Sequence, residues 1–225
     1  MMKKEFMNNG VKISYVKRGA GRPFILLHGN GEDHSLFDDI AGRLSEEGYE
    51  VYTPDSRGHG NSDKVRRLRY EDMADDIIGL INHEGLSGND RPILFGFSDG
   101  GIVGLLIAMR CPDMLKRLIV AGVNLSPDGI ILKIRAAMRL AFLFTRSDLL
   151  RLMLTQPDIR KERLSSVTVP LIVLHAERDM VKLSHSLSIN EAVKDVKLMI
   201  VKGETHGSYI KDNTKLYDLL APLLG

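Results

Sequence analysis

The stretch ILFGFSDGGIVGLLIAM, residues 93–109, joins two apolar segments through a short polar turn. A run of apolar residues ends at Phe97, and an apolar stretch with helical spacing begins directly after Asp99. Between them stands Ser98, with glycines two positions before it and two positions after it. A short, continuous apolar run beside turn residues is typical of a strand that is buried on both faces. The stretch therefore predicts a buried strand, a tight turn that carries a hydroxyl, and a buried helix.

Similar apolar runs recur along the chain and alternate with helical patterns. A hairpin is expected first, with the turn pair Asn9-Gly10 between two alternating segments. The further strands are expected at 23–29, 49–55, 92–98, 115–123, 170–179 and 196–203, and helices near 36–48, 70–84, 99–110, 182–193 and 213–224. Strands that alternate with helices form parallel βαβ units. We predict an α/β fold: a mostly parallel eight-stranded sheet with an N-terminal antiparallel hairpin and helices on both faces.

The alternation breaks between residues 125 and 168, where the sequence is helix-like and rich in Met and Leu. We interpret this segment as a reduced helical lid, or cap, inserted after the sixth strand. Residues 1–124 and 169–225 are then the core. Most of the apolar stripe in this segment packs the lid itself, but a lid must cover something with its apolar face. We therefore expect Met138 and Phe142 to line an apolar substrate pocket.

Composition restricts the class of protein. The chain has 225 residues, of which 44% are hydrophobic and 27% charged, with a formal net charge of +2, as in a soluble globular domain. Its only cysteine is Cys111, so no disulfide can form within the chain. The basic cluster over 64–69 has no aromatic platform beside it, which favours a solvated loop and no nucleic-acid partner. No signal-peptide pattern or membrane-spanning run is present, so we expect a cytoplasmic protein without a membrane partner.

The turn after residue 97 has the pattern of a nucleophile. Gly96-Phe97-Ser98-Asp99-Gly100 matches the G-x-S-x-G nucleophile elbow, in which a serine hydroxyl is exposed on a sharp strand-to-helix turn. Glycines suit this turn because Cβ atoms at their positions would clash. In an open α/β sheet, ligands bind at the carboxyl ends of the strands, which is where Ser98 is expected. The hydroxyl is therefore a candidate nucleophile.

With these residues the chain resembles the α/β-hydrolase superfamily, and within it the small-cap, serine-nucleophile esterases and lactonases. Four further stretches fit: LLHGNGED (26–33), similar to the His-Gly oxyanion loop; DSRGHGNS (55–62), similar to the D-x-R-G-x-G-x-S signature; HAERDMV (175–181), similar to the acid loop; and GETHGSY (203–209), similar to the histidine loop. The order of Ser98, Asp179 and His206 is the order of the superfamily.

The resemblance implies a role for each site residue. His206 is the expected base that takes the proton of Ser98, and Asp179 is expected to hold the imidazole tautomer and stabilise the imidazolium. The backbone N–H groups of Asn30 and Asp99 are assigned to the oxyanion hole. The carboxylate of Asp99 stands in the first turn of its helix, where the dipole favours it, and we also consider a contact with a polar substrate group. His28 and Gly29, in the oxyanion loop, are assigned to the substrate pocket.

Several alternatives stay open at this point. Ser98 also fits a plain helix cap. Glu177 and Asp128 compete with Asp179 as the acid, and Ala176-Glu177 replaces the glycine that is common before it. The lid stripe also fits simple packing. His28 and His59 are expected to be structural, His175 a satisfied buried residue, and His34, His83 and His185 surface residues. A metal at His28, Asp55 and His59 is disfavoured because no ligand spacing supports it.

The sequence thus predicts a hydrolase that works without a cofactor or metal on a small, partly apolar ester or related acyl bond. Its partner is a small-molecule substrate. The same groups also fit C–C bond hydrolysis, lactone opening or acyl transfer, and a binding protein that uses the pocket as a receptor. Epoxide and haloalkane hydrolysis are disfavoured, because those relatives carry an aspartate where this chain has Ser98. Substrate identity and oligomeric state are left open.

Overall fold

The computed structural model describes residues 1–224, apart from the side chain of Asn213. Its single sheet has the strand order β1-β2-β4-β3-β5-β6-β7-β8. The strands are β1 (Met2–Asn8), β2 (Val11–Gly19), β3 (Arg22–Leu27), β4 (Tyr49–Pro54), β5 (Ile93–Phe97), β6 (Arg117–Ala121), β7 (Leu171–Arg178) and β8 (Val196–Thr205). Strand β2 pairs antiparallel with β1 and β4, and the other pairs are parallel. The predicted fold class is confirmed.

The N-terminal hairpin forms where its turn residues predict it. Asn9 and Gly10 have φ values of 49° and 77°, and Asn8 pairs with Val11. Two consecutive positive φ values match the right-handed twist of the strands, and Asn-Gly is the pair that adopts them at least cost. The hairpin places β2 beside β4, so that β1 forms one edge of the sheet.

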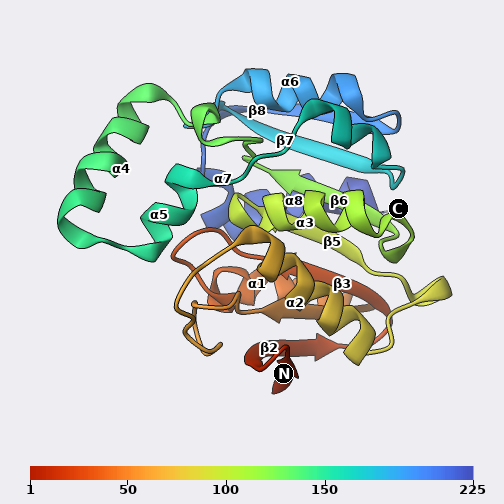
Figure 1. Cartoon of the computed structure of the whole chain (residues 1–225). Helices are drawn as coiled ribbons and strands as arrows, with labels where there is room; N and C mark the ends of the chain where they lie inside the picture. The colour runs from red at the N-terminus through yellow and green to blue at the C-terminus, as the bar shows by residue number, and fades with distance from the viewer. Residues whose placement is uncertain (225) are drawn as a thin grey trace.

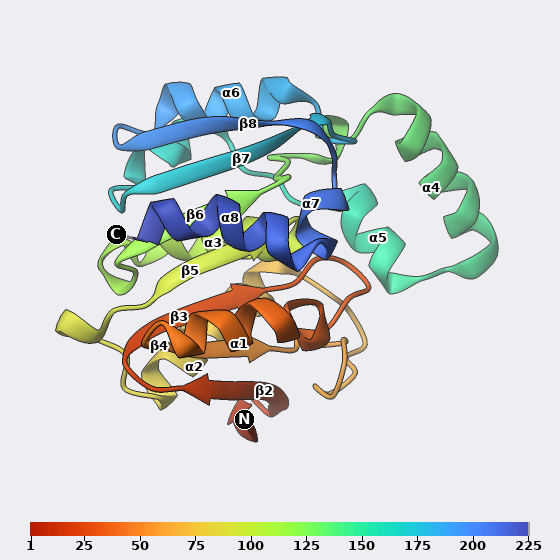
Figure 2. The same ribbon diagram turned by 180° about the vertical axis from the view of Figure 1, so that it is seen from behind.

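Helices cover both faces of the sheet (Figures 1 and 2). On one face lie α2 (Tyr70–His83), α3 (Asp99–Arg110) and α6 (Leu183–Ala192); on the other lie α1 (Asp38–Glu46), α7 (Ser208–Lys211) and α8 (Asn213–Leu224). The apolar spacing of α2 explains its placement, since Met73, Ile77 and Ile81 are buried against the sheet. Short 3-10 helices lie at η1 (His34–Phe37), η2 (Gly88–Asp90), η3 (Pro112–Met114) and η4 (Pro127–Gly129). Two apolar cores result, one in each layer.

The segment between β6 and β7 forms α4 (Leu132–Thr145), α5 (Asp148–Thr155) and η5 (Lys161–Ser166). It leaves the sheet at the carboxyl end of β6, and α4 extends away from the body of the molecule, at the left in Figure 1. The predicted helical insertion after the sixth strand is thus where the sequence pattern put it. Across residues 1–224, every helix is too short or too polar to cross a bilayer.

Candidate active site

Ser98 lies at the junction of β5 and α3 with a φ of 51° and a ψ of −112°. Non-glycine residues rarely adopt a positive φ, and the strain is retained only where the surroundings enforce it. Those surroundings are close: a Cβ on Gly96 would lie 2.3 Å from the carbonyl oxygen of Gly100, and one on Gly100 would lie 2.3 Å from that of Leu27. The N–H of Ser98 also donates to Ala121 at 2.8 Å. The glycines of the elbow are therefore a steric requirement.

The structure brings together the three side chains proposed as a catalytic triad. The Nε2 atom of His206 lies 3.2 Å from the Oγ atom of Ser98, and its Nδ1 atom lies 2.7 Å from Oδ1 of Asp179. They come from the ends of three strands, β5, β7 and β8. An ionised carboxylate only accepts, so Nδ1 carries the proton and the lone pair of Nε2 faces the hydroxyl. This is the tautomer that a general base needs.

Asp179 is 0% exposed in its side chain and also accepts the N–H of Val181 at 2.9 Å. Burial alone would raise its pKa, but the hydrogen bond and charge of His206 hold the pKa of Asp179 below its usual value. The competing acids lie elsewhere. Glu177 is exposed and accepts the N–H of Gly203, while Asp128 is exposed and accepts the hydroxyl of Ser126. Among the acids considered, the one in contact with His206 is Asp179.

Two residues that the sequence did not single out fix the imidazole. The ring of Phe97 lies 5.0 Å from that of His206, centroid to centroid. A Cβ on Gly122 would lie 2.6 Å from Cε1 of His206. Gly122 has a φ of +64° and directly follows β6. In the sequence, a glycine directly after a buried strand could have indicated that another group approaches the backbone closely there.

The two residues assigned to the oxyanion hole are joined through their side chains. The amide of Asn30 donates to Oδ2 of Asp99 at 2.9 Å, and the hydroxyl of Tyr70 donates to Oδ1 at 2.7 Å. Asp99 begins α3, so its own N–H has no partner within the helix. Burial raises the pKa of the Asp99 carboxyl, although both hydrogen bonds oppose this. The side chain therefore points to Asn30 and Tyr70, and its contact with a polar substrate group stays a prediction.

A cleft of about 250 Å³ opens over Ser98 and His206. Its apolar lining comes from Phe97, from Met153 on α5 and from Met180 after β7. Its polar lining includes Asn30, Glu32 and Lys211. Burial raises the pKa of Glu32, whose carboxylate accepts the N–H of Gly29 at 3.1 Å, while the charge of Lys211 opposes the rise. The cleft is thus lined by apolar side chains from both the cap and the sheet, with polar groups between them.

The four residues assigned to the pocket do not line this cleft. Met138 and Phe142 lie half-buried on α4, the cap helix that extends outward, whereas α5 reaches the cleft. His28 is 1% exposed and lies below the surface, and Gly29 is buried against Glu32 and Phe97. The correction has a simple cause: apolar spacing locates the inner face of a helix but not which of two cap helices covers the site.

His28 and Asp55 are structural anchors. The Nδ1–H of His28 donates to Gly29 at 2.8 Å and Nε2 accepts the N–H of Ser56 at 3.0 Å. Burial lowers the pKa of His28 to about 4, so the ring is neutral and has no lone pair left for a metal. Asp55 accepts the N–H groups of Asn61 and His34, and a Cβ on Gly60 would lie 2.3 Å from its carboxyl carbon.

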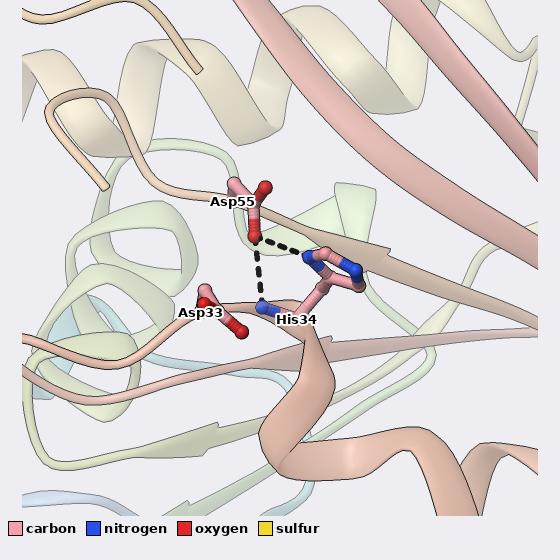
Figure 3. Close-up of side chains that lie close together, drawn as sticks. All are labelled: Asp33, His34 and Asp55. Carbon is pink, nitrogen blue, oxygen red and sulfur yellow. Dashed lines mark hydrogen bonds and ion pairs between the residues drawn. The ribbon is translucent and has the colours of Figure 1, made fainter. Parts of the chain in front are cut away.

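Figure 3 shows the cluster of Asp33, His34 and Asp55, whose ligand-type atoms lie within 4.8 Å of one another. The Nδ1 atom of His34 lies 2.8 Å from Oδ1 of Asp55, and Asp33 accepts the N–H and hydroxyl of Ser35. These bonds within the chain account for the cluster. They also correct the expectation that His34 is a surface residue. His185 is likewise half-buried, and its Nδ1 accepts the N–H of Leu125 at 3.1 Å.

The other residues of DSRGHGNS (55–62) connect the loop after β4 to α2. Arg57 makes two hydrogen bonds to Asp76, of 2.6 Å and 2.7 Å. Ser62 accepts the N–H of Ser14 and donates to the carbonyl of Asp55. His59 and His175 are buried and hydrogen-bonded, as expected, the latter to Ser186. The residues of DSRGHGNS therefore support the loops beside the site rather than line the cleft.

Comparison with known proteins places this geometry in a family. Residues 22–161 match the model of the family described as serine aminopeptidase, S33. The AB hydrolase superfamily protein YisY of Bacillus subtilis is 24% identical over an alignment 249 positions long, which covers 90% of this chain and 91% of that protein. A mouse sn-1-specific diacylglycerol lipase is 35% identical over 106 residues, 47% of this chain and 33% of the lipase. The chain spans about two-fifths of the length of other curated relatives that it matches.

A solved esterase from Exiguobacterium antarcticum superposes with a TM-score of 0.82 at 21% identity and covers 96% of both chains. At this identity the likeness shows the fold alone. The family match covers more than half of the chain and includes the elbow. The chain therefore belongs to the serine aminopeptidase S33 family of the α/β-hydrolase superfamily.

Proposed function

We propose that the protein is a serine hydrolase that cleaves a carboxylic ester, or a related acyl bond, through an acyl-enzyme on Ser98. The observation that carries the proposal is the unbroken chain of hydrogen-bonding contacts from Ser98 through His206 to Asp179 on a strained elbow. A serine hydroxyl becomes an effective nucleophile only when a positioned base takes its proton. The esterase and lipase names of the relatives support this choice.

In the proposed mechanism each group has its own step. Oγ of Ser98 attacks the carbonyl carbon while Nε2 of His206 takes the hydroxyl proton. The negative charge that forms on the carbonyl oxygen is stabilised by the backbone N–H groups of Asn30 and Asp99. The bond to the alcohol then breaks, and the imidazolium returns the proton to the leaving oxygen. Water, activated by the same imidazole, hydrolyses the acyl-Ser98 ester and restores the hydroxyl.

The cleft limits the substrate. A volume of about 250 Å³ lies below the usual range for pockets that hold drug-sized ligands. Met153 of the cap and Met180 after β7 offer an apolar surface to the acyl group. Short acyl esters fit this space better than long ones, so we expect kcat/KM for p-nitrophenyl esters to fall beyond acyl chains of about six carbons.

The test is pre-steady-state kinetics with p-nitrophenyl acetate together with fluorophosphonate labelling. Wild-type protein is expected to give a burst of about one nitrophenolate per chain and to be labelled once. Ser98→Ala should abolish both, whereas Ser87→Ala, an exposed serine outside the cleft, should change neither. A folded wild-type protein that neither hydrolyses a panel of esters nor takes the label would overturn the proposal.

A further inference from the structure

The outer face of α4 is apolar and has no partner within the described residues. Leu132, Leu140, Leu143 and Phe144 are 68%, 59%, 60% and 82% exposed. With about 100° of rotation per residue, these four positions fall within an arc of about 120° on one side of the helix. No residue of α4 is buried. Figures 1 and 2 both show the helix standing away from the sheet and its covering helices.

This outer face is distinct from the surface that α4 uses for packing. Ile134, Met138 and Phe142 lie half-buried on the opposite side, and α4 contacts α5. The cap therefore holds together through the inner face. A single exposed leucine is ordinary, but a contiguous apolar strip on one helix marks an interaction surface.

The charge around the strip is of one sign. Lys133 and Arg139 are exposed: Lys133 falls within the apolar arc, between Leu140 and Phe144 around the helix, Arg139 falls at its edge, and Arg146 follows the helix. No aspartate or glutamate occurs between Asp128 and Asp148. The rest of the protein is close to balanced, with a formal net charge of +2 for the whole chain. The cations are therefore concentrated beside exposed apolar side chains.

We propose that α4 docks on an anionic lipid surface. Leucine and phenylalanine side chains enter the boundary between headgroups and acyl chains, and the long side chains of Lys133 and Arg139 beside them reach lipid phosphates. The expectation of no membrane partner rested on the lack of a spanning segment, which does not bear on a helix that lies on a surface. The docking does not depend on the proposed function, since no residue of α4 lines the cleft.

A second copy of the chain fits this face less well. Two α4 helices in twofold contact bring Lys133 and Arg139 of one copy close to those of the other, and α4 has no acid to neutralise them. Like charges in a contact from which water is excluded oppose association. A helix of this length also offers only a fraction of the roughly 800 Å² per partner that stable protein interfaces bury.

The experiment is flotation of the full chain with vesicles. Phosphatidylcholine vesicles are compared with mixed vesicles that contain about 30% phosphatidylglycerol, at low and at high salt. Wild-type protein is expected to bind the mixed vesicles at least about tenfold better at low salt. The double variant L143S/F144S should lose at least about tenfold of this binding. The control is L183S/L187S, which removes two leucines that are each 42% exposed on α6; it should bind like the wild type.

All four substituted side chains are exposed, so the melting temperature should stay within about 3 °C of the wild-type value. Three outcomes overturn the proposal. The first is the absence of any preference for anionic vesicles, and the second is equal binding by L143S/F144S and the wild type. The third is a wild-type dimer in sedimentation equilibrium that L143S/F144S converts to monomer, which would assign the face to a second copy.

Discussion

The side-chain amide of Asn30 donates a 2.9 Å hydrogen bond to the carboxylate of Asp99. The loop after β3 and the first turn of α3 are thereby tied together. These are the two residues whose main-chain N–H groups we assign to the developing oxyanion. The hydroxyl of Tyr70 at the start of α2 holds the other carboxylate oxygen. Three elements thus fix the spacing between the two amide donors.

Loss of the hydrogen bond between Asn30 and Asp99 should lower kcat more than it raises KM. For Asp99→Ala we expect kcat to fall by about 10- to 100-fold with KM within about threefold of the wild-type value, since a displaced oxyanion donor acts on the transition state. Tyr70→Phe keeps the bond between Asn30 and Asp99 and should cost less than about tenfold. Steady-state kinetics with a short p-nitrophenyl ester measures both. A large rise in KM at constant kcat would instead mean that the carboxylate contacts substrate.

Gly122 provides a separate test of how His206 is held. In Gly122→Ala the new Cβ would lie 2.6 Å from Cε1 of His206, so the imidazole must move away from Ser98. We expect a loss of at least about 100-fold in kcat, because an error of about 1 Å in position is enough for that effect. Gly203→Ala is the matched control: Gly203 also has a positive φ, of +74°, but nothing within 4 Å of its Cβ position. Similar activity losses in both variants would contradict this role.

The pH profile should report one ionisation on its acid side. His206 holds the pKa of Asp179 below its usual value despite burial, so the carboxylate stays charged in mildly acidic solution. We expect the acid limb of kcat/KM to have a slope of about one, because Asp179 takes up no proton there. Asp179→Asn should lower kcat by about 1,000-fold or more, since the imidazole loses its tautomer, whereas Glu177→Gln should retain activity. An acid limb with a slope of two would show that Asp179 takes up a proton as well.

Glu84 after α2 should make stability depend on pH. Burial opposes its ionisation, yet hydrogen bonds from Tyr15, Lys17 and Lys4 lower the pKa of Glu84 to about 2. A carboxyl whose pKa is about 4.3 in the unfolded chain then stabilises the fold at neutral pH, and this contribution is lost as the pH falls from about 5 toward 2.

Urea denaturation of Glu84→Gln checks this expectation. We expect a loss of about 2 kcal/mol in the free energy of unfolding at pH 7, and a smaller difference from the wild type at pH 3. Glu46→Gln makes the same charge change at the exposed end of α1 and should stay within about 0.5 kcal/mol of the wild type at both pH values. A constant difference for Glu84→Gln across this range would exclude the linkage.

The local sequence was enough to predict those features whose geometry is set within one short stretch of chain. Asn9-Gly10 specifies its turn because few residue pairs adopt two positive φ values. Gly96 and Gly100 specify the elbow because a Cβ atom at either position would clash with a nearby carbonyl oxygen. The buried strands could be predicted because each is a short, continuous run of apolar residues. The sheet order places the ends of β5, β7 and β8 close together, so the three candidate side chains meet although 108 positions separate Ser98 from His206.

Contacts between elements were beyond the sequence. Tyr70 and Asp99 meet because α2 packs beside α3, and neither helix pattern carries that information. His34 and His185 sit in polar segments and were assigned to the surface, yet each is hydrogen-bonded by another loop. Met138 and Phe142 have the spacing of an inner helix face, but that face meets α5 and not the cleft. Which element covers which is decided by chain direction and turn angles that periodicity does not encode.

The chain leaves the sheet after β6 and returns at β7, and the α4–α5 excursion carries none of the three proposed reacting side chains. It supplies Met153 to the cleft wall and the exposed strip of α4 to the outside. The segment between β6 and β7 thus shapes one wall of the cleft without holding a proposed reacting group. A change in its length or sequence would alter the space above Ser98, while the contacts of His206 with Ser98 and Asp179, which lie at the ends of β5, β7 and β8, would keep their distances.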